Sequence, residues 1–162
     1  MIFTTKAEYG VRLLVELGRV QRSDDPTRPV SLKAIAEAEA LPLAYLERIV
    51  ALLKKDGIVE STRGAHGGYR LTVDAADLTM DRVIVALEGP VAPMACFVED
   101  RPDQARVLCS HESDRGHGCA TKLLWTRVQG GVMRALQQTT LADLVEFSGR
   151  DEPVLPPVIT AA

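Results

Sequence analysis

Three cysteines flank one polar stretch in the second half of this sequence of 162 residues. Twelve residues separate Cys96 from Cys109, and nine separate Cys109 from Cys119. The stretch 91–118 has no hydrophobic period and is rich in Pro, Asp, Arg, Gly, Ser and His, which is typical of a functional or mobile segment. In a cytoplasmic protein, three such thiols are typical of metal ligands or redox groups and not of a disulfide framework.

The cytoplasm is the expected compartment because the sequence shows neither a signal peptide nor a membrane-spanning segment. Residues 1–6 do not begin a signal peptide, and no apolar run approaches the roughly 18 residues that span a bilayer. Hydrophobic residues make up 46% and charged residues 25%, as in ordinary globular proteins. The net charge of −3 is not the footprint of a basic nucleic-acid binder, but residues 1–73 hold 11 Lys plus Arg against 9 Asp plus Glu.

Basic residues gather on a predicted helix and the hairpin that follows it. The segment 43–55 is predicted to be a helix because four apolar residues recur at helical spacing: Leu46, Ile49, Val50 and Leu53. Its other face holds small and charged residues: Ala44, Glu47, Arg48, Ala51 and Lys55. A hairpin follows, with a basic, glycine-rich tip at 63–68 that can adopt positive φ angles. This arrangement indicates a winged helix-turn-helix, a module that reads DNA.

Two further helices precede this segment and help to position it. Thr5 is the expected N-cap of a helix that runs to about Val20, with Glu8 closing a capping box. Ser31 caps a short helix at 32–40, and the turn at Leu41 and Pro42 leads into the next helix. We therefore expect three helices and a wing within about 72 residues.

Helical periodicity returns on both sides of the cysteine stretch. A helix is predicted at 80–88, and one of about 20 residues follows Cys119. The longer helix contains a Gly130-Gly131 pair that costs about 1 kcal/mol per glycine unless another helix approaches closely. Because this amphipathic helix lies outside the small domain, its expected partner is the same helix of a second subunit. One or two more turns are predicted at 140–147.

Five segments carry a family resemblance: residues 4–9, Tyr45-Leu46-Glu47, 63–71, Leu87-Glu88-Gly89-Pro90 with Cys96, and 139–144. Together they resemble the Rrf-two family of bacterial transcription regulators. The match covers roughly residues 1–147, and the wing and the Glu-Gly-Pro segment are its most specific parts. The resemblance implies a homodimer, mostly α-helical with a small β-wing, in which a winged helix-turn-helix is joined to a long C-terminal dimerisation helix.

The expected organisation follows from this resemblance. A winged helix-turn-helix DNA-binding domain spans 1–79, and a connecting helix with a cysteine-containing sensor loop spans 80–120. The dimerisation helix spans 121–147, and a flexible tail spans 148–162.

The resemblance also implies which residues meet double-stranded operator DNA. Four residues of the third helix would face the major groove: Ala44, Tyr45, Glu47 and Arg48. Arg63 and the wing glycines, including Gly67, would enter the minor groove, while Lys55 adds positive charge and His66 suits a phosphate contact. The alternative for Tyr45 is core packing, and Glu47 could accept from cytosine, repel phosphate or pair with a neighbouring cation.

Many family members hold an iron-sulfur cluster in the loop before the dimerisation helix. The resemblance therefore implies a cluster, 2Fe-2S in preference to 4Fe-4S, on Cys96, Cys109 and Cys119, although the cysteine gaps here are wider than in most cluster-binding relatives. Lys122 stands where one branch has a histidine ligand, and Glu8 matches the carboxylate that another branch takes from the partner's first helix. His111 and His117 are further candidates, and the alternatives are free cysteines or zinc.

The expected function is a transcription regulator, acting as a repressor, whose operator binding responds to redox state, nitric oxide or cluster supply. Cluster assembly or loss would reorder the loop 91–118 and reset the angle between the two recognition helices. The alternatives are a cluster-free regulator of the same family and a zinc-stabilised winged helix that binds proteins. An enzyme is not expected, because no catalytic triad, phosphate loop or paired-carboxylate cleft can be assembled from the motifs.

Overall fold

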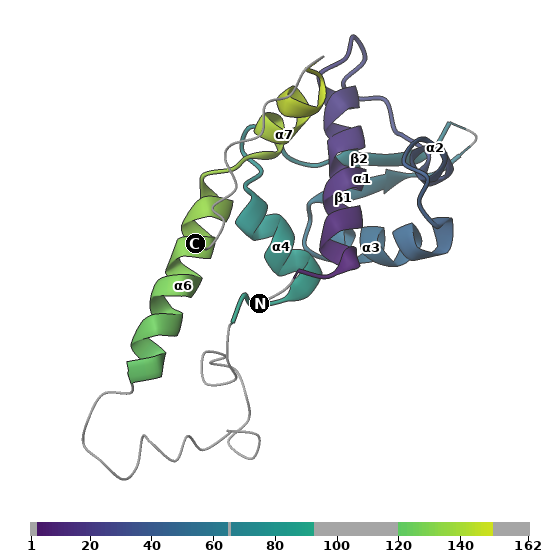
Figure 1. Ribbon diagram of the computed structural model, residues 1–162. Coiled ribbons are helices and arrows are strands. Elements are labelled where there is room, and N and C mark those ends of the chain that lie inside the picture. Colours follow the sequence, from purple (N-terminus) through teal and green to yellow (C-terminus); the bar gives the residue numbers. More distant parts are fainter. Residues whose placement is uncertain (1–2, 65, 93–119, 151–162) are drawn as a thin grey trace.

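The computed structural model describes residues 3–64, 66–92 and 120–150. Along the chain these residues form α1 (Thr5–Gln21), α2 (Leu32–Ala38), α3 (Leu43–Lys55), β1 (Val59–Thr62), β2 (Gly68–Leu71), α4 (Met80–Glu88), α6 (Ala120–Gln137) and α7 (Leu141–Ser148). Figure 1 shows α1 crossing the middle of the winged part, with α6 extending away from it. The fold is mostly helical with a two-stranded antiparallel sheet, which confirms the fold class expected from the sequence.

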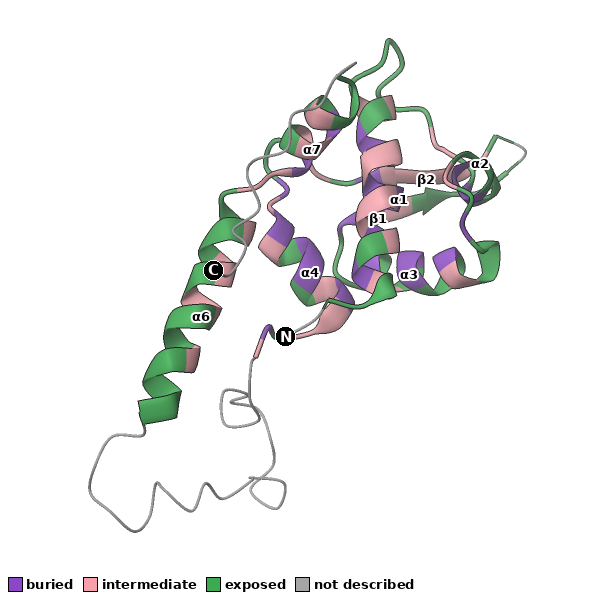
Figure 2. Cartoon of the chain, in the orientation of Figure 1, coloured by how far each residue is buried: buried purple, intermediate pink, exposed green. Residues whose placement is uncertain are grey.

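The hydrophobic core forms around α1. This helix packs against α3, α4, β2 and α7, and Leu13 and Leu14 are fully buried on it. Leu46 and Leu53 of α3 and Ile35 of α2 meet them there. Each of these side chains stabilises the fold by about 1.5 to 3 kcal/mol through burial. The buried residues, purple in Figure 2, therefore lie along the inner faces of α1, α3 and α4.

The first turn of α1 differs from the expectation. Thr4, and not Thr5, is the N-cap, and its hydroxyl accepts from the Lys6 N–H at 3.2 Å. The predicted capping box of Thr5 and Glu8 was wrong, because the helix begins one residue earlier and places Ala7 at the position that Glu8 would occupy. The Thr4 hydroxyl also donates to Glu88 at the end of α4. Glu8 is thereby left without a capping role.

The turn between α2 and α3 is set by a left-handed residue. α2 ends at Ala38, two residues earlier than expected, and Ala40 has φ of 52°. The Leu41 N–H donates to the Ala36 carbonyl at 2.9 Å and the Ala40 N–H to Glu37 at 3.4 Å, which is the Schellman pattern. An alanine in this conformation is uncommon, so sequence alone favoured a longer helix.

The wing is a short hairpin in which two glycines are required for different structural reasons. Val59 pairs with Leu71 and Thr62 with Gly68. Gly64 has φ of +117°, as expected for a tight turn. Gly67 instead allows a close approach, because an added Cβ would lie 2.3 Å from the Thr62 carbonyl oxygen. Tyr69 also exchanges backbone hydrogen bonds with Val30, which ties the wing to the segment before α2.

After α6 the chain returns to the winged part, where α7 packs against α1. The Leu141 N–H donates to the Leu78 carbonyl at 2.8 Å, and Leu141 is fully buried. Thr140 and Asp143 form a capping box, and the Thr140 N–H and hydroxyl lower the pKa of the Asp143 carboxyl. Gly18 of α1 allows this contact, since an added Cβ would lie 2.7 Å from Val145 Cγ2. The C-terminal end of α6 is therefore fixed to the winged part, because it leads directly into α7.

α6 carries an apolar face that no other described segment covers. It has no buried residue, and Figure 2 colours most of it as exposed. Leu123, Leu124 and Val128 expose 57%, 55% and 37% of their surface. In the described part of the chain, no helix is both long enough and apolar enough to span a membrane.

Candidate nucleic-acid interface

The helix α3 has the two faces that its periodicity predicted. Leu46, Ile49, Val50 and Leu53 are buried. Ala44, Glu47 and Arg48 are exposed along the opposite side. Because residues four apart lie one above the other on a helix, Ala44 and Arg48 share a single exposed strip. The core therefore fixes α3 while leaving a small side chain and an arginine free to enter a groove.

Some of the basic residues around this strip have partners within the described part of the chain, and others do not. Arg70 pairs with Glu60 across the wing, and Lys54 donates to the Ser61 hydroxyl at 2.7 Å. Arg48, Lys55 and Arg63 are exposed and make no ion pair with another described residue. These three cations need not break an internal pair before they contact a phosphate or a base edge.

Glu47 lies beside this strip without a counter-ion. It is exposed, and none of the ion pairs among the described residues includes it. Of the three roles predicted for Glu47, pairing with a neighbouring cation is therefore absent among the described residues. Its two remaining roles are acceptance from a cytosine amino group and repulsion of phosphate.

Tyr45 is packed more deeply than its neighbours on α3. It is half-buried against the core, and its ring meets that of Tyr9 edge to face, with centroids 5.7 Å apart and planes at 88°. This geometry is favourable for two aromatic rings. Tyr45 therefore packs against the core, which was the alternative to a DNA contact for this residue. Its ring also lines a surface hollow.

This hollow opens beside the exposed strip of α3. Its volume is about 530 Å³, and it is lined by Thr5 and Tyr9 of α1 together with Pro42, Ala44, Tyr45 and Arg48. Sequence reasoning missed Thr5, Tyr9 and Pro42. No local signal could have found them, because Tyr9 and Tyr45 are 36 residues apart (45 − 9) and meet only through the packing of α1 on α3.

The wing places its basic residues beyond the end of the sheet. Arg63 and His66 are exposed on either side of residue 65, which lies outside the described residues. Gly67 is partly buried where the chain returns to β2. An exposed arginine at the tip of a hairpin next to an exposed helix can reach a second groove of the same duplex.

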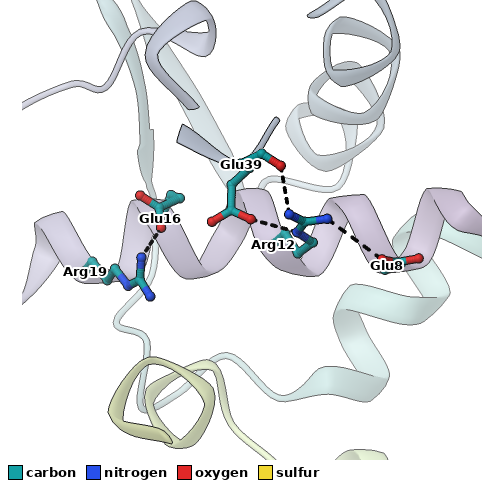
Figure 3. Close-up of polar contacts among 5 residues, drawn as sticks. All are labelled: Glu8, Arg12, Glu16, Arg19 and Glu39. Carbon is teal, nitrogen blue, oxygen red and sulfur yellow. Dashed lines mark hydrogen bonds and ion pairs between the residues drawn. The ribbon is translucent and has the colours of Figure 1, made fainter. Parts of the chain in front are cut away.

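Glu8 lies on α1 with a loosely held carboxylate, as Figure 3 shows. Arg12 donates from Nε to Glu39 Oε2 at 2.7 Å and from Nη2 to the Glu39 carbonyl at 2.7 Å. Its Nη1 is 3.9 Å from Glu8 Oε1. Arg12 is therefore held mainly by Glu39 at the end of α2. On the same helix, Arg19 pairs with Glu16.

The remaining predicted ligands fall outside the described residues. Cys96, Cys109 and Cys119, as well as His111 and His117, belong to the segment 93–119. Among residues 3–64, 66–92 and 120–150, no group of three or more His, Cys, Asp or Glu side chains could hold a metal ion. The predicted cluster ligands therefore stay predictions.

Comparison with known proteins agrees with this geometry. The family model described as Rrf2, an iron-dependent transcriptional regulator, matches residues 3–147. Protein rrf2 of Nitratidesulfovibrio vulgaris is 34% identical over 145 residues, covering 90% of this chain and 87% of that protein.

Two solved structures extend the comparison to the fold. CymR, the global cysteine regulator of B. subtilis, is 33% identical and covers 91% of this chain and 98% of its own, with a TM-score of 0.70. IscR of T. potens is 31% identical and covers 91% of this chain and 88% of its own, with a TM-score of 0.69. From its exposed α3, its wing and these matches, we conclude that the chain is a DNA-binding transcription regulator, not an enzyme, and belongs to the Rrf2 family.

Proposed function

We propose that this protein is a homodimeric repressor that reads operator DNA with α3 and the wing, and whose operator binding is controlled by an iron-sulfur cluster. The proposal depends most on the exposed strip of Ala44 and Arg48, flanked by Lys55 and Arg63, because these three cations make no ion pair with another described residue. In this proposal Arg48 donates two hydrogen bonds to a guanine edge, and Arg63 enters the adjacent minor groove.

The homodimer is supported by the uncovered face of α6. Leu123, Leu124 and Val128 are exposed on it, and Gly131 lies within about 20° of Leu124 in angle around the helix. An added Cβ at Gly131 would touch no other described residue, so packing among the described residues does not explain this glycine. A second copy of α6 crossing there would explain it, and would place two copies of α3 on two half-sites.

The cluster is supported by the donor set that the chain offers. Cys96, Cys109 and Cys119 would supply thiolates, and Glu8 of the other subunit would supply a carboxylate. Glu8 is exposed and has no capping role. Its carboxylate comes no nearer to the Arg12 guanidinium than 3.9 Å, so binding a metal would break no strong contact. When bound, such a cluster supplies a redox-active and labile group.

The test is a visible absorption spectrum with iron and sulfide assays on protein purified without oxygen. Iron and sulfide in equal amounts, with a broad band between roughly 400 and 500 nm, are expected for a thiolate-bound cluster. The variant Glu8→Gln should lose the cluster faster on exposure to air than the wild type. Glu16→Gln, also a carboxylate change on α1, is the matched control and should behave as the wild type.

A cluster-free regulator is the second candidate. The likeness to the cysteine regulator CymR, with a TM-score of 0.70, is as strong as the likeness to IscR, at 0.69. Colourless protein that takes up no iron and sulfide on reconstitution would contradict the cluster and favour this candidate. Zinc in a ratio near one per chain would favour a zinc-stabilised site instead.

A further inference from the structure

The hollow between α1 and α3 joins the face of α3 that reads DNA. Its walls are mainly apolar, and they include the Ala44 methyl group, the rings of Tyr9 and Tyr45, and Arg48. The two rings are half-buried and meet edge to face, so this wall keeps its shape when α3 approaches another molecule. The hollow is therefore a preformed apolar recess beside an arginine, Arg48, that forms no ion pair within the described part of the chain.

The occupant must suit both the apolar walls and the neighbouring positive charge. Ala44 and Arg48 lie on the strip that is already assigned to the major groove, so the hollow is continuous with the DNA interface. The apolar group on base edges in that groove is the 5-methyl group of thymine, and alanine is a side chain that contacts it. A phosphate would instead leave the ring and methyl surfaces without an apolar partner.

We propose that the hollow receives the methyl edge of a thymine, so that Tyr9 and Ala44 select thymine while Arg48 reads a nearby guanine. Ala44 and Arg48 are four residues apart, about 6 Å along the helix axis, and successive bases are about 3.4 Å apart. The selected thymine should therefore lie one or two base pairs from the guanine. This inference rests on the proposed reading of DNA by α3.

The first test removes only the methyl group from the DNA. An operator is selected from random double-stranded DNA with the full-length protein, and each thymine is then replaced in turn by deoxyuridine. Fluorescence anisotropy gives the dissociation constant of each duplex. One thymine per half-site, one or two base pairs from a guanine, should lose about four-fold in affinity, the size expected for one buried methyl group. Deoxyuridine at other thymines should change affinity little.

The second test alters the hollow. Ala44→Leu fills the recess from an exposed position, so the ratio of deoxyuridine to thymidine dissociation constants should fall from about four to near one. Tyr9→Phe keeps the ring and should keep the ratio, whereas Tyr9→Ala should lower it. Ala76→Leu, an exposed alanine outside the hollow, is the matched control and should keep the ratio.

Three results would overturn the inference. Either no thymine is sensitive to loss of its methyl group, or all thymines are equally sensitive, or the ratio is unchanged in Ala44→Leu. Each of these leaves the reading of DNA by α3 in place, because the unmodified operator is still bound. Failure to select any preferred sequence would instead overturn the sequence-specific reading of DNA itself, and this inference with it.

Discussion

At the scale of single residues, the proposed sequence-specific binding depends most on Arg48. It is exposed one turn after Ala44, and no described carboxylate neutralises it. We predict that Arg48→Ala weakens operator binding by about ten-fold per half-site, within the 1 to 3 kcal/mol that a bidentate arginine–guanine contact supplies. Anisotropy titrations against the selected operator measure this.

The control for this prediction is a change of the same charge elsewhere. Arg22 is exposed at the C-terminal end of α1, whereas Thr5 and Tyr9 at the other end line the hollow. Arg22→Ala should alter operator affinity by less than about two-fold at physiological salt, because it acts only through screened charge. Equal losses in both variants would show that Arg48 contributes net charge and not base recognition.

Residue roles were predictable from sequence only where they depend on local spacing. The exposed strip of α3 followed from a helical period within 13 residues. The wall formed by Tyr9 did not, because its partner is on another helix. Glu8 had two predicted roles, and the structure removed the capping role because the helix begins at Thr5 with Thr4 as its N-cap.

At the scale of elements, one Schellman motif ends α2 just before α3, and a second ends α3, where the N–H groups of Ile58 and Gly57 donate to the carbonyls of Leu53 and Lys54. Ala40 precedes α3 with φ of 52°, and Gly57 follows it with φ of 64°. A left-handed conformation costs about 1 to 2 kcal/mol for alanine and almost nothing for glycine. We predict that Ala40→Gly raises the free energy of unfolding by about 1 kcal/mol, while Gly57→Ala lowers it by a similar amount. Urea unfolding monitored by circular dichroism measures both.

The two variants control one another, since they exchange the same two residues at equivalent positions. A decrease in stability for Ala40→Gly would mean that the entropy of glycine in the unfolded chain outweighs the relief of strain. Sequence reasoning extended α2 to residue 40 for this reason: an alanine carries no signal for a left-handed turn. The end of α3 at Lys55, by contrast, agrees with the helix predicted at 43–55.

A second prediction at this scale concerns the contact of α1 with α4. An added Cβ at Gly10 would lie 2.4 Å from Leu87 Cδ1, and Leu87 is buried. Gly10→Ala should therefore lower the free energy of unfolding by about 1 to 3 kcal/mol through overpacking, despite the better helix propensity of alanine. Gly10→Ala combined with Leu87→Ala should recover part of the loss attributable to the clash, compared with Leu87→Ala alone. Urea unfolding of the four proteins measures this coupling, and its absence would contradict the predicted clash.

At the scale of the whole molecule, the proposed homodimer depends on the exposed apolar face of α6. We predict that Gly131→Ala increases helicity, because alanine favours a helix by about 1 kcal/mol over glycine, yet raises the dimer dissociation constant by about ten-fold through loss of close approach. Analytical ultracentrifugation measures the dissociation constant.

Thr126→Ala is the control for this prediction. Thr126 is exposed on α6 but lies on a different side of the helix from Leu124, Val128 and Gly131, so the substitution also favours the helix without entering the proposed interface. The two variants should therefore differ in dimer affinity. If Gly131→Ala strengthened the dimer or left it unchanged, α6 would not cross its copy at this glycine.

The overall arrangement was predictable to the extent that it depends on periodic segments. The winged part, the connecting helix and the long helix all have the expected order. The period of α4 did not reveal that α4 and α7 share a core with α1, because contacts between distant segments leave no local pattern. The cysteines belong to the segment outside the described residues, so their chemistry rests on resemblance and on Glu8.

The most direct test compares operator affinity with and without the cluster. Protein purified without oxygen and the same protein after cluster removal are titrated with the selected operator at one fixed salt concentration. The two dissociation constants should differ by about ten-fold or more, a coupling of about 1.4 kcal/mol, and Cys109→Ala should bind as the cluster-free protein does. Equal affinities for the two forms would contradict control of operator binding by a cluster.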